Sequence, residues 1–271
     1  MRSARGIITL LTDFGYFDPY VATMKGVILN INPNVNIIDI THDIPKYNIR
    51  YGALILRAVV PFFPPQAIHV AVVDPGVGSE RKAIIVETKD DRLLVGPDNG
   101  LLSLVAKERG LKKAVEISNE RYMLKPQSTT FAGRDVFAPV AAYLSLGIEP
   151  EEFGEELETI EEVNLPKSYL MGKEIRGKII AIDSFGNIIT NIPFTQVRSI
   201  VRFGETLEVC IGGKRMVVPF VRTYGEVSRG ELLALIDSFN YLEVSVNKGN
   251  AAKRLGASVG AEVIIRRGGG D

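Results

Sequence analysis

The sequence is poor in the residues that cross-link proteins or bind metals. Among its 271 residues it has one cysteine, Cys210, no tryptophan and only two histidines, His42 and His69. A single cysteine forms no internal disulfide, and no Cys/His cluster has the spacing of a zinc site. We therefore expect a fold held by its hydrophobic core, with no metal.

An excess of charge of either sign and a long apolar segment are also lacking. Lys and Arg together number 32, as do Asp and Glu, so the formal net charge is zero. Proteins that bind nucleic acid or membrane surfaces normally carry a basic excess, and a bilayer span needs about 18 consecutive apolar residues. We expect no nucleic-acid partner, no membrane contact and a cytoplasmic location.

In residues 1–160, apolar runs typical of strands alternate with segments of helical periodicity. This alternation predicts βαβ units, and hence an N-terminal α/β domain with a mostly parallel sheet. The expected strands are Ile7–Leu11, Asn36–Ile40, Ile68–Val73, Ala83–Glu87 and Leu93–Val95. The expected helices are Val21–Leu29, Tyr51–Phe62, Leu101–Glu108 and Val136–Ser145.

From Lys173 the pattern changes to short strands separated by Gly, Asn and Asp, which predicts a C-terminal β domain over 173–271, a barrel or a sandwich. The acidic stretch Glu151–Glu162, followed by Pro166, is the expected linker. The expected strands are Ile175–Ile182, Ile188–Ile192, Thr206–Ile211, Arg215–Val221, Ala234–Asp237, Leu242–Val246 and Glu262–Arg266.

Three loops of the first domain place an aspartate, Asp13, Asp74 or Asp98, directly after an apolar strand. Ligands of open α/β sheets bind beyond the carboxyl ends of the strands, where a carboxylate can accept hydrogen bonds from a ribose diol or orient a water. Asp and Gly also make ordinary turns and caps, so each loop alone is open to both interpretations. Arg81 either pairs with Asp74 or lies on the surface beside Glu80.

The remaining polar candidates are weaker. The sequence has neither of the glycine-rich phosphate motifs nor a G-x-S-x-G elbow. His69 lies inside an apolar strand and is expected in the core, whereas His42 follows a strand and is expected to orient a loop. On one tight turn, Asp183 and Asn187 could meet an amine and a purine edge, or form an ordinary hairpin turn. By spacing alone Ser245, like Asn247 beside it, is only an exposed polar residue.

Taken together, these motifs resemble the S-adenosylmethionine (SAM) hydrolase family, also called SAM hydroxide adenosyltransferase, which is related to the SAM-dependent fluorinase and chlorinase. The resemblance covers nearly the whole chain, in order. It rests on the six segments Leu11–Gly15, Asp39–His42, Val73–Gly78, Gly96–Leu101, Phe131–Asp135 and Asp183–Asn187.

The resemblance implies cleavage of SAM into adenosine and L-methionine by attack of water or hydroxide at the ribose C5′, with SAM as substrate and no cofactor. It also implies a homotrimer, in which SAM lies between the N-terminal domain of one subunit and the C-terminal domain of the next. In the related halogenating enzymes, a halide attacks the same carbon.

For substrate binding, the resemblance implies contacts from both domains. Asp13 would hold the ribose hydroxyls, Asp18 and Tyr20 would face the methionine portion, and Tyr47 would pack on the ligand. In the second domain Asp183 would meet the methionine ammonium, Asn187 the adenine edge and Ser245 the amino-acid end. Val246 belongs to the same implied binding set.

For catalysis, the resemblance implies a nucleophile pocket among Asp74, Arg81 and the Phe131–Gly133 loop. The hydrolases use an Asp, Arg and His trio, but Ala132 occupies the histidine position here, so we expect a weakened enzyme. The intact flanking residues favour an engineered replacement; a natural member working with Asp74 and Arg81 alone stays open.

Two other functions remain as alternatives. One is a SAM- or adenosine-binding protein without catalysis, since binding does not need the missing histidine. The other is a SAM-dependent halogenase, which Asp74 disfavours because the halogenating relatives carry an aromatic residue at that position.

Overall fold

The computed structural model describes residues 6–269 and divides the chain into two compact units. Unit 1 ends at Asn164 and unit 2 begins at Leu165, between the two predicted domains. Among the described residues, no helix is both long and apolar enough to cross a membrane.

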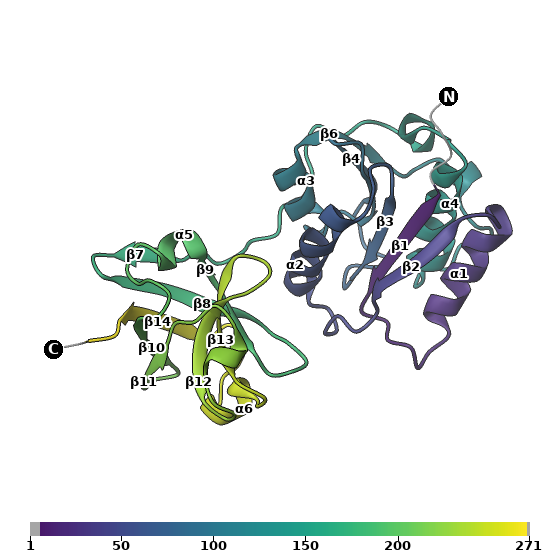
Figure 1. The fold of residues 1–271 in the computed structure, drawn as a ribbon. Coiled ribbons are helices and arrows are strands. Elements are labelled where there is room, and N and C mark those ends of the chain that lie inside the picture. The colour runs from purple at the N-terminus through teal and green to yellow at the C-terminus, as the bar shows by residue number, and fades with distance from the viewer. Residues whose placement is uncertain (1–5, 270–271) are drawn as a thin grey trace. The chain divides into compact units, whose positions relative to one another are not determined.

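Unit 1 is built on a six-stranded sheet with the order β2-β1-β3-β5-β4-β6 (Figure 1). All strands run in one direction except β4, which is antiparallel to both of its neighbours. The predicted mostly parallel sheet is therefore confirmed, with β4 and β5 forming the predicted strand pair. The strands are β1 (Ile7–Thr12), β2 (Asn36–Thr41), β3 (Ile68–Val72), β4 (Ala83–Thr88), β5 (Leu93–Pro97) and β6 (Leu111–Glu116).

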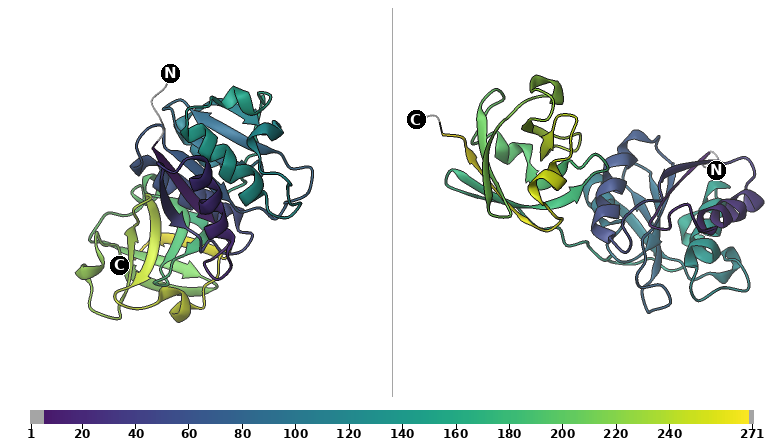
Figure 2. Two further views of the ribbon diagram at one scale, coloured as in Figure 1. Left: turned by 90° about the vertical axis from the view of Figure 1, so that its right-hand side faces the viewer. Right: turned by 90° about the horizontal axis from the view of Figure 1, so that it is seen from below.

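Helices cover both faces of this sheet, as the views in Figures 1 and 2 show. On one face α1 (Tyr20–Ile31) packs against α4 (Ala138–Ser145), and on the other α2 (Ile49–Val59) packs against α3 (Ser103–Arg109). Every residue of β3 is buried, which explains why its sequence is a continuous apolar run rather than an alternation. The carboxyl ends of β1 and β3 thus emerge from a rigid, fully covered core.

The acidic segment expected to link the domains belongs instead to unit 1, so that expectation is wrong. Phe153 is fully buried in the core beneath α4. The following backbone runs beside β6, where the Leu157 amide donates to the Ala114 carbonyl at 2.8 Å. Lys113 of β6 pairs with Glu151. An edge strand rich in lysine thus attracts the acidic segment, and Phe153 anchors it.

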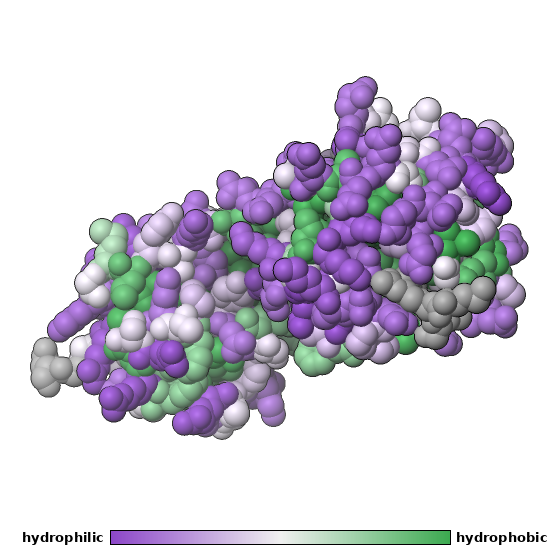
Figure 3. Space-filling view, turned by 90° about the horizontal axis from the view of Figure 1, so that it is seen from above, coloured by the Kyte–Doolittle hydropathy of each residue, from purple (hydrophilic) through white to green (hydrophobic). Residues whose placement is uncertain are grey.

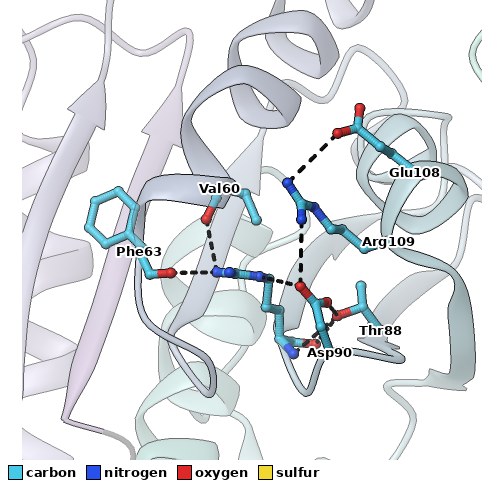
Figure 4. A network of polar contacts seen from close by, with 7 residues as sticks. Val60, Phe63, Thr88, Asp90, Glu108 and Arg109 are labelled. Atoms are coloured by element: carbon cyan, nitrogen blue, oxygen red, sulfur yellow. Dashed lines mark hydrogen bonds and ion pairs between the residues drawn. The ribbon is translucent and has the colours of Figure 1, made fainter.

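Arg92 braces the end of the sheet at which the parallel strands begin. Its buried guanidinium donates to the carbonyls of Val60 and Phe63, at 2.9 and 2.6 Å, just after the C-terminus of α2. Asp90 accepts from Arg92 Nε at 2.8 Å and also faces Arg109 (Figure 4). These contacts give charged donors to two carbonyls that follow the helix end, of which that of Val60 also accepts from the Phe63 amide.

Unit 2 is an antiparallel sheet with the order β11-β10-β14-β8-β9-β13-β12. A bridge between Phe220, just after β11, and Ala234 of β12 joins the two ends of this order, so the sheet is a nearly closed barrel. Its interior is apolar, and the partly buried Phe203 stacks on the buried Phe220 with the ring centres 4.5 Å apart. The predicted all-β C-terminal domain is confirmed.

The elements of unit 2 alternate with tight turns. Its strands are β7 (Tyr169–Met171), β8 (Glu174–Ile182), β9 (Ile188–Pro193), β10 (Thr206–Ile211), β11 (Lys214–Pro219), β12 (Leu232–Ile236), β13 (Tyr241–Val246) and β14 (Glu262–Arg267). Two short helices, α5 (Phe194–Val197) and α6 (Ala251–Leu255), complete it. In the view of Figure 3 most of the visible surface is hydrophilic, with smaller apolar patches.

Candidate functional site

The strongest polar feature of unit 1 is the pair of Asp74 and Arg81. Arg81 Nε donates to both carboxylate oxygens of Asp74, at 3.0 and 2.8 Å, and Nη2 lies 2.5 Å from Oδ2. The Asp74 side chain is only 5% exposed, so the pair is largely shielded from water. The guanidinium also lies 5.3 Å from the ring centre of Phe137. Of the two alternatives open for Arg81, the structure shows the pairing with Asp74, which fixes the carboxylate just after β3.

A cavity of about 180 Å³ opens beside this carboxylate. Three aromatic rings surround it: Tyr20 and Phe131 lie 5.0 Å apart, and Phe14 lies 5.6 and 5.9 Å from them. Ala132 also lines it, and so shares this space with Asp74. The structure thus brings Asp74 and the Phe131–Gly133 loop together at one cavity, and Tyr20, which was expected at the methionine portion, lines the same cavity.

The Phe131–Gly133 loop is held by a π-helical turn over Gly133–Phe137, a feature that is frequent at functional sites. A side chain at Gly133 would come within 3.4 Å of Phe131, Met24 and Phe14, so only glycine fits there without moving the rings. Asp135 accepts from the Ser128 amide at 2.7 Å and from Arg134, which ties the preceding loop to the turn.

Asp13 lies at the end of β1 and its carboxylate is already engaged. Oδ2 accepts a 2.8 Å hydrogen bond from the amide of Tyr47, and the Lys46 ammonium donates to the Asp13 carbonyl. Tyr47 has a positive φ of 64°, and the residue is 70% exposed. Asp18 lies on the exposed segment after β1. Asp13 and Tyr47 are therefore brought together, while Asp18 is placed on the surface.

His42 is buried and ties the loop of Asp13 to strand β2. Its Nδ1 shares a 2.8 Å hydrogen bond with Thr12 Oγ1, and its Nε2 lies 3.2 Å from Asp39. Burial lowers the pKa of His42, against the opposing effect of Asp39. Burial alone would raise the pKa of Asp39, but hydrogen bonds from Lys25, His42 and Tyr16 together lower it. The backbone carbonyl of His42 also accepts from the Gly15 amide. These contacts agree with the expectation that His42 orients a loop, here the one that contains Asp13.

His69 and Asp98, by contrast, do not reach the cavity. His69 is fully buried on β3 with a 2.8 Å hydrogen bond to Thr9, and burial lowers its pKa to about 3, so it is the expected core histidine. Asp98 accepts the Glu161 amide at 2.8 Å, and burial raises the pKa of its carboxyl. The three aspartate loops therefore have different roles.

Unit 2 holds a larger cavity, of about 670 Å³. Asp183 lines it, and its Oδ1 accepts from the amides of Phe185 and Asn187, both at 2.9 Å, which makes the expected hairpin turn. Asn187 Nδ2 donates to Asp183 Oδ2 at 2.9 Å. Val246 and Asn247 are also part of the wall. The turn thus presents a carboxylate and an amide to one space of ligand size.

Ser245 lies elsewhere, and its expected exposure is wrong. It is fully buried because β13 is paired on both sides, by β9 and β12. Its hydroxyl donates to Glu243, which is 4% exposed and also accepts from Tyr224 at 2.7 Å. Burial, with the nearby Asp183 and Asp237, raises the pKa of Glu243.

Sequence reasoning missed Tyr224 and Lys248 in this wall, and Glu243 behind it. The available signal was the charge of Glu243 inside the apolar strand Tyr241–Val246, where a lone carboxylate needs partners. Within residues 6–269 there is no cluster of three or more His, Cys, Asp or Glu side chains arranged to hold a metal ion.

Comparison with known proteins agrees with this two-part arrangement. Residues 8–154 match the family model of the SAM hydroxide adenosyltransferase N-terminal domain, and residues 177–264 match that of its C-terminal domain. The (R)-S-adenosyl-L-methionine hydrolase of Methanocaldococcus jannaschii is 42% identical, covering 96% of this chain and 95% of that one.

More distant and structural similarities extend over the same length. A fluorinase of an Actinoplanes species is 26% identical, covering 96% of this chain and 97% of the fluorinase. The crystal structure of an uncharacterized conserved protein from Thermotoga maritima superposes with a TM-score of 0.92 at 40% identity, covering 96% of this chain and 100% of that one.

Proposed function

Because the chain belongs to the SAM hydroxide adenosyltransferase family, we propose that it hydrolyses SAM to adenosine and L-methionine at the cavity beside Asp74. The observation that carries this proposal is the fixed Asp74–Arg81 pair facing Ala132 across a cavity lined by aromatic rings. The sulfonium of SAM leaves as a neutral thioether, so the reaction needs no general acid. It needs a water held in line with the C5′–S bond. As the C5′–O bond forms and the C5′–S bond breaks, that water gives up one proton, which passes to solvent.

Unit 1 supplies a fixed hydrogen-bond acceptor for such a water. The Asp74 carboxylate accepts a hydrogen bond from the water, and Arg81 keeps both carboxylate oxygens in place during the attack. A cavity of about 180 Å³ holds several waters, each of which takes roughly 30 Å³ in the liquid, or one water and the reacting carbon. Positioning of this kind contributes roughly 7–11 kcal/mol toward lowering the barrier.

With Ala132 at the histidine position, the site has no third side chain that could orient the water or accept its proton. A methyl group neither takes a proton nor hydrogen-bonds a water, whereas a base or orienting group typically adds about 10²–10⁴ in rate. The proposed enzyme therefore works with Asp74 and Arg81 alone and is slow. The same alanine favours the second candidate function, a protein that binds SAM or adenosine without cleaving it.

Unit 2 supplies recognition in this proposal. Asp183 meets the methionine ammonium and Asn187 the adenine edge, in a cavity whose volume suits a whole small molecule. In unit 1, Asp13 holds the ribose hydroxyls. The trimer is part of the proposal, with the binding residues of unit 1 and of unit 2 contributed by different subunits, as in a ring of heterologous contacts.

Incubation with SAM followed by chromatography tests the reaction. Adenosine and L-methionine in equal amounts are the expected products. SAM binding measured by calorimetry without any adenosine supports the binding protein instead. A 5′-halogenated nucleoside formed only in the presence of halide would support the halogenase.

Mixing two variants tests the shared site. Asp13→Ala and Asp183→Ala each remove one binding carboxylate, on unit 1 and on unit 2. If two subunits build each site, mixed trimers contain some intact sites and recover part of the SAM binding. No recovery, after subunit exchange has been verified by mass spectrometry, would overturn the shared site.

A further inference from the structure

Three loops of unit 1 place an aspartate after a strand. The proposed reaction uses two of them and does not use the third, Gly96–Gly100. Asp98 points away from the cavity toward residue 161, and none of the loop's residues lines the cavity. The loop nevertheless contacts the chain immediately before Asp74. Asn99 Nδ2 donates a 2.9 Å hydrogen bond to the carbonyl of Val73.

We propose that Asn99 is a positioning residue for Asp74, holding the peptide group from which the proposed water-orienting carboxylate extends. This inference rests on the proposed function. The observation behind it is the hydrogen bond from the Asn99 side chain to the Val73 carbonyl. Val73 is fully buried and directly follows the last residue of β3.

The geometry of the peptide bond explains why this contact matters. The Val73 carbonyl and the Asp74 amide belong to one planar group, so fixing the oxygen fixes the direction in which Asp74 leaves the strand. Arg81 holds the other end of Asp74, its carboxylate. Asn99 and Arg81 together fix Asp74 at the backbone and at the side chain.

The loop is rigid enough to serve as this support. Asn99 Oδ1 accepts the Leu101 amide at 3.2 Å, which fixes the amide group of Asn99 in the required orientation. The Asp98 amide donates to the Lys82 carbonyl at 2.9 Å, and the Asp98 carboxylate accepts from the Glu161 amide at 2.8 Å. The loop is thus anchored on two sides before Asn99 reaches Val73.

The two glycines of the loop allow this close packing. A side chain at Gly96 would collide with the Ala71 carbonyl on β3. Gly100 has a positive φ of 94°, and a Cβ there would lie 2.7 Å from the amide nitrogen of Val163. Both positions therefore exclude any other residue, and they keep Asn99 within hydrogen-bond reach of the β3 end.

The chain offers a matched control for Asn99. Asn119 makes the same two kinds of contact within unit 1: its Nδ2 donates to the Glu152 carbonyl at 2.8 Å, and its Oδ1 accepts the Arg121 amide at 3.2 Å. Asn119 contacts neither Asp74 nor the cavity residues. Its substitution reports what the loss of such a bridge does to stability alone.

The experiment compares Asn99→Ala with Asn119→Ala by two measurements. In protein labelled with ¹⁵N-aspartate, the Asp74 amide signal, assigned by its loss in Asp74→Asn, moves in Asn99→Ala and stays in Asn119→Ala. In SAM turnover, Asn99→Ala lowers kcat by about 10- to 100-fold, the scale of a misplacement near 1 Å, while the Kd for adenosine changes by less than about threefold.

Asn99→Asp serves if the alanine variant does not fold. It keeps the acceptor for the Leu101 amide and replaces the donor toward Val73 by a carboxylate oxygen, which repels the Val73 carbonyl, so the Asp74 signal is expected to move at least as far as in Asn99→Ala. An unmoved Asp74 signal would overturn the inference, as would an equal fall of kcat in Asn119→Ala. If the unmodified protein turns over no SAM, the proposed function fails, and the Asp74 signal alone decides the role of Asn99.

Discussion

The two units present carboxylates to their cavities in different ways. In unit 1, Asp74 is held by a partly buried arginine and faces a cavity of about 180 Å³. In unit 2, Asp183 is held by amides of its own turn and faces a cavity of about 670 Å³. Sites for small ligands usually measure about 300–1,000 Å³, so the cavity of unit 2 suits a whole molecule and that of unit 1 a reacting centre.

This difference follows from the architecture of each unit. Parallel strands of unit 1 end together, so a charged pair and three aromatic rings from separate loops meet at one edge of the sheet. The antiparallel unit 2 has hairpins, whose turns expose backbone amides and short polar side chains. Under the proposed function, the chemical step takes place in unit 1, and unit 2 contributes to ligand recognition together with Asp13 of unit 1. Three substitutions test this division, and a fourth tests a buried carboxylate of unit 2.

Asp74→Asn should have the largest effect. The asparagine keeps the shape of the residue but loses the charge that orients the water, so kcat should fall by about 10²–10⁴-fold with little change in the Kd for SAM. Steady-state turnover and calorimetry measure the two quantities. Asp90→Asn is the control, because it alters another aspartate–arginine pair, at the opposite end of the sheet. A similar loss of turnover in that control would contradict the assignment.

Ala132→His should raise the rate of SAM hydrolysis by about 10²-fold, since one base or orienting group returns to the cavity of unit 1. Ala132→Leu fills part of the same space without a proton acceptor and should bring no gain. The measurement is adenosine release per enzyme. Equal rates in the parent protein and the histidine variant would show that position 132 is not a catalytic site.

Asp183→Asn should weaken SAM binding by about 10- to 100-fold and leave kcat nearly unchanged, because a charge-assisted hydrogen bond is worth roughly 1.5–3 kcal/mol. Asparagine retains the Oδ1 acceptor for the amides of Phe185 and Asn187, which keeps the backbone of the turn, and loses only the Oδ2 acceptor for the side chain of Asn187. Asp237 makes the same turn with Phe239 and is the matched control. Calorimetry should find the Kd for SAM of Asp237→Asn close to that of the parent. A large fall of kcat in Asp183→Asn would contradict a role of Asp183 in binding alone.

Glu243→Gln should have the smallest effect, on the pH dependence of stability. Burial raises the pKa of Glu243 above that of an unfolded glutamate, so the folded state binds its proton more tightly and ionisation costs stability as pH rises. The cost is absent below the unfolded pKa and complete above the folded one. Gln avoids it while keeping an acceptor for Tyr224 and Ser245.

Thermal unfolding at pH 4 and at pH 7.5 measures this effect. The Tm of Glu243→Gln relative to the parent should be higher at pH 7.5 than at pH 4. A Tm difference that does not change with pH would show that Glu243 keeps the same protonation state throughout. In that case the ionisation of Glu243 would not contribute to the pH dependence of stability.

Much of the fold could be predicted because local patterns coincide with it. The strand runs of β1, β3 and β9 and the helical spacing of α1 were predicted within a few residues. Strand β6 was missed because its sequence is charged and only half-buried, and the acidic segment beside it was taken for a linker. In that case a tertiary contact, the burial of Phe153, overrode composition.

The sequence by itself determined the two architectures and the set of residues from which a site could be made, since hydrophobic periodicity and turn residues act over short stretches of chain. Only the tertiary structure decided which of those residues meet. It placed Asp74 against Arg81, directed Asp98 toward residue 161, and buried Ser245 against Glu243. The physical reason is that strand pairing and helix packing set these directions, and both depend on residues far apart in the chain.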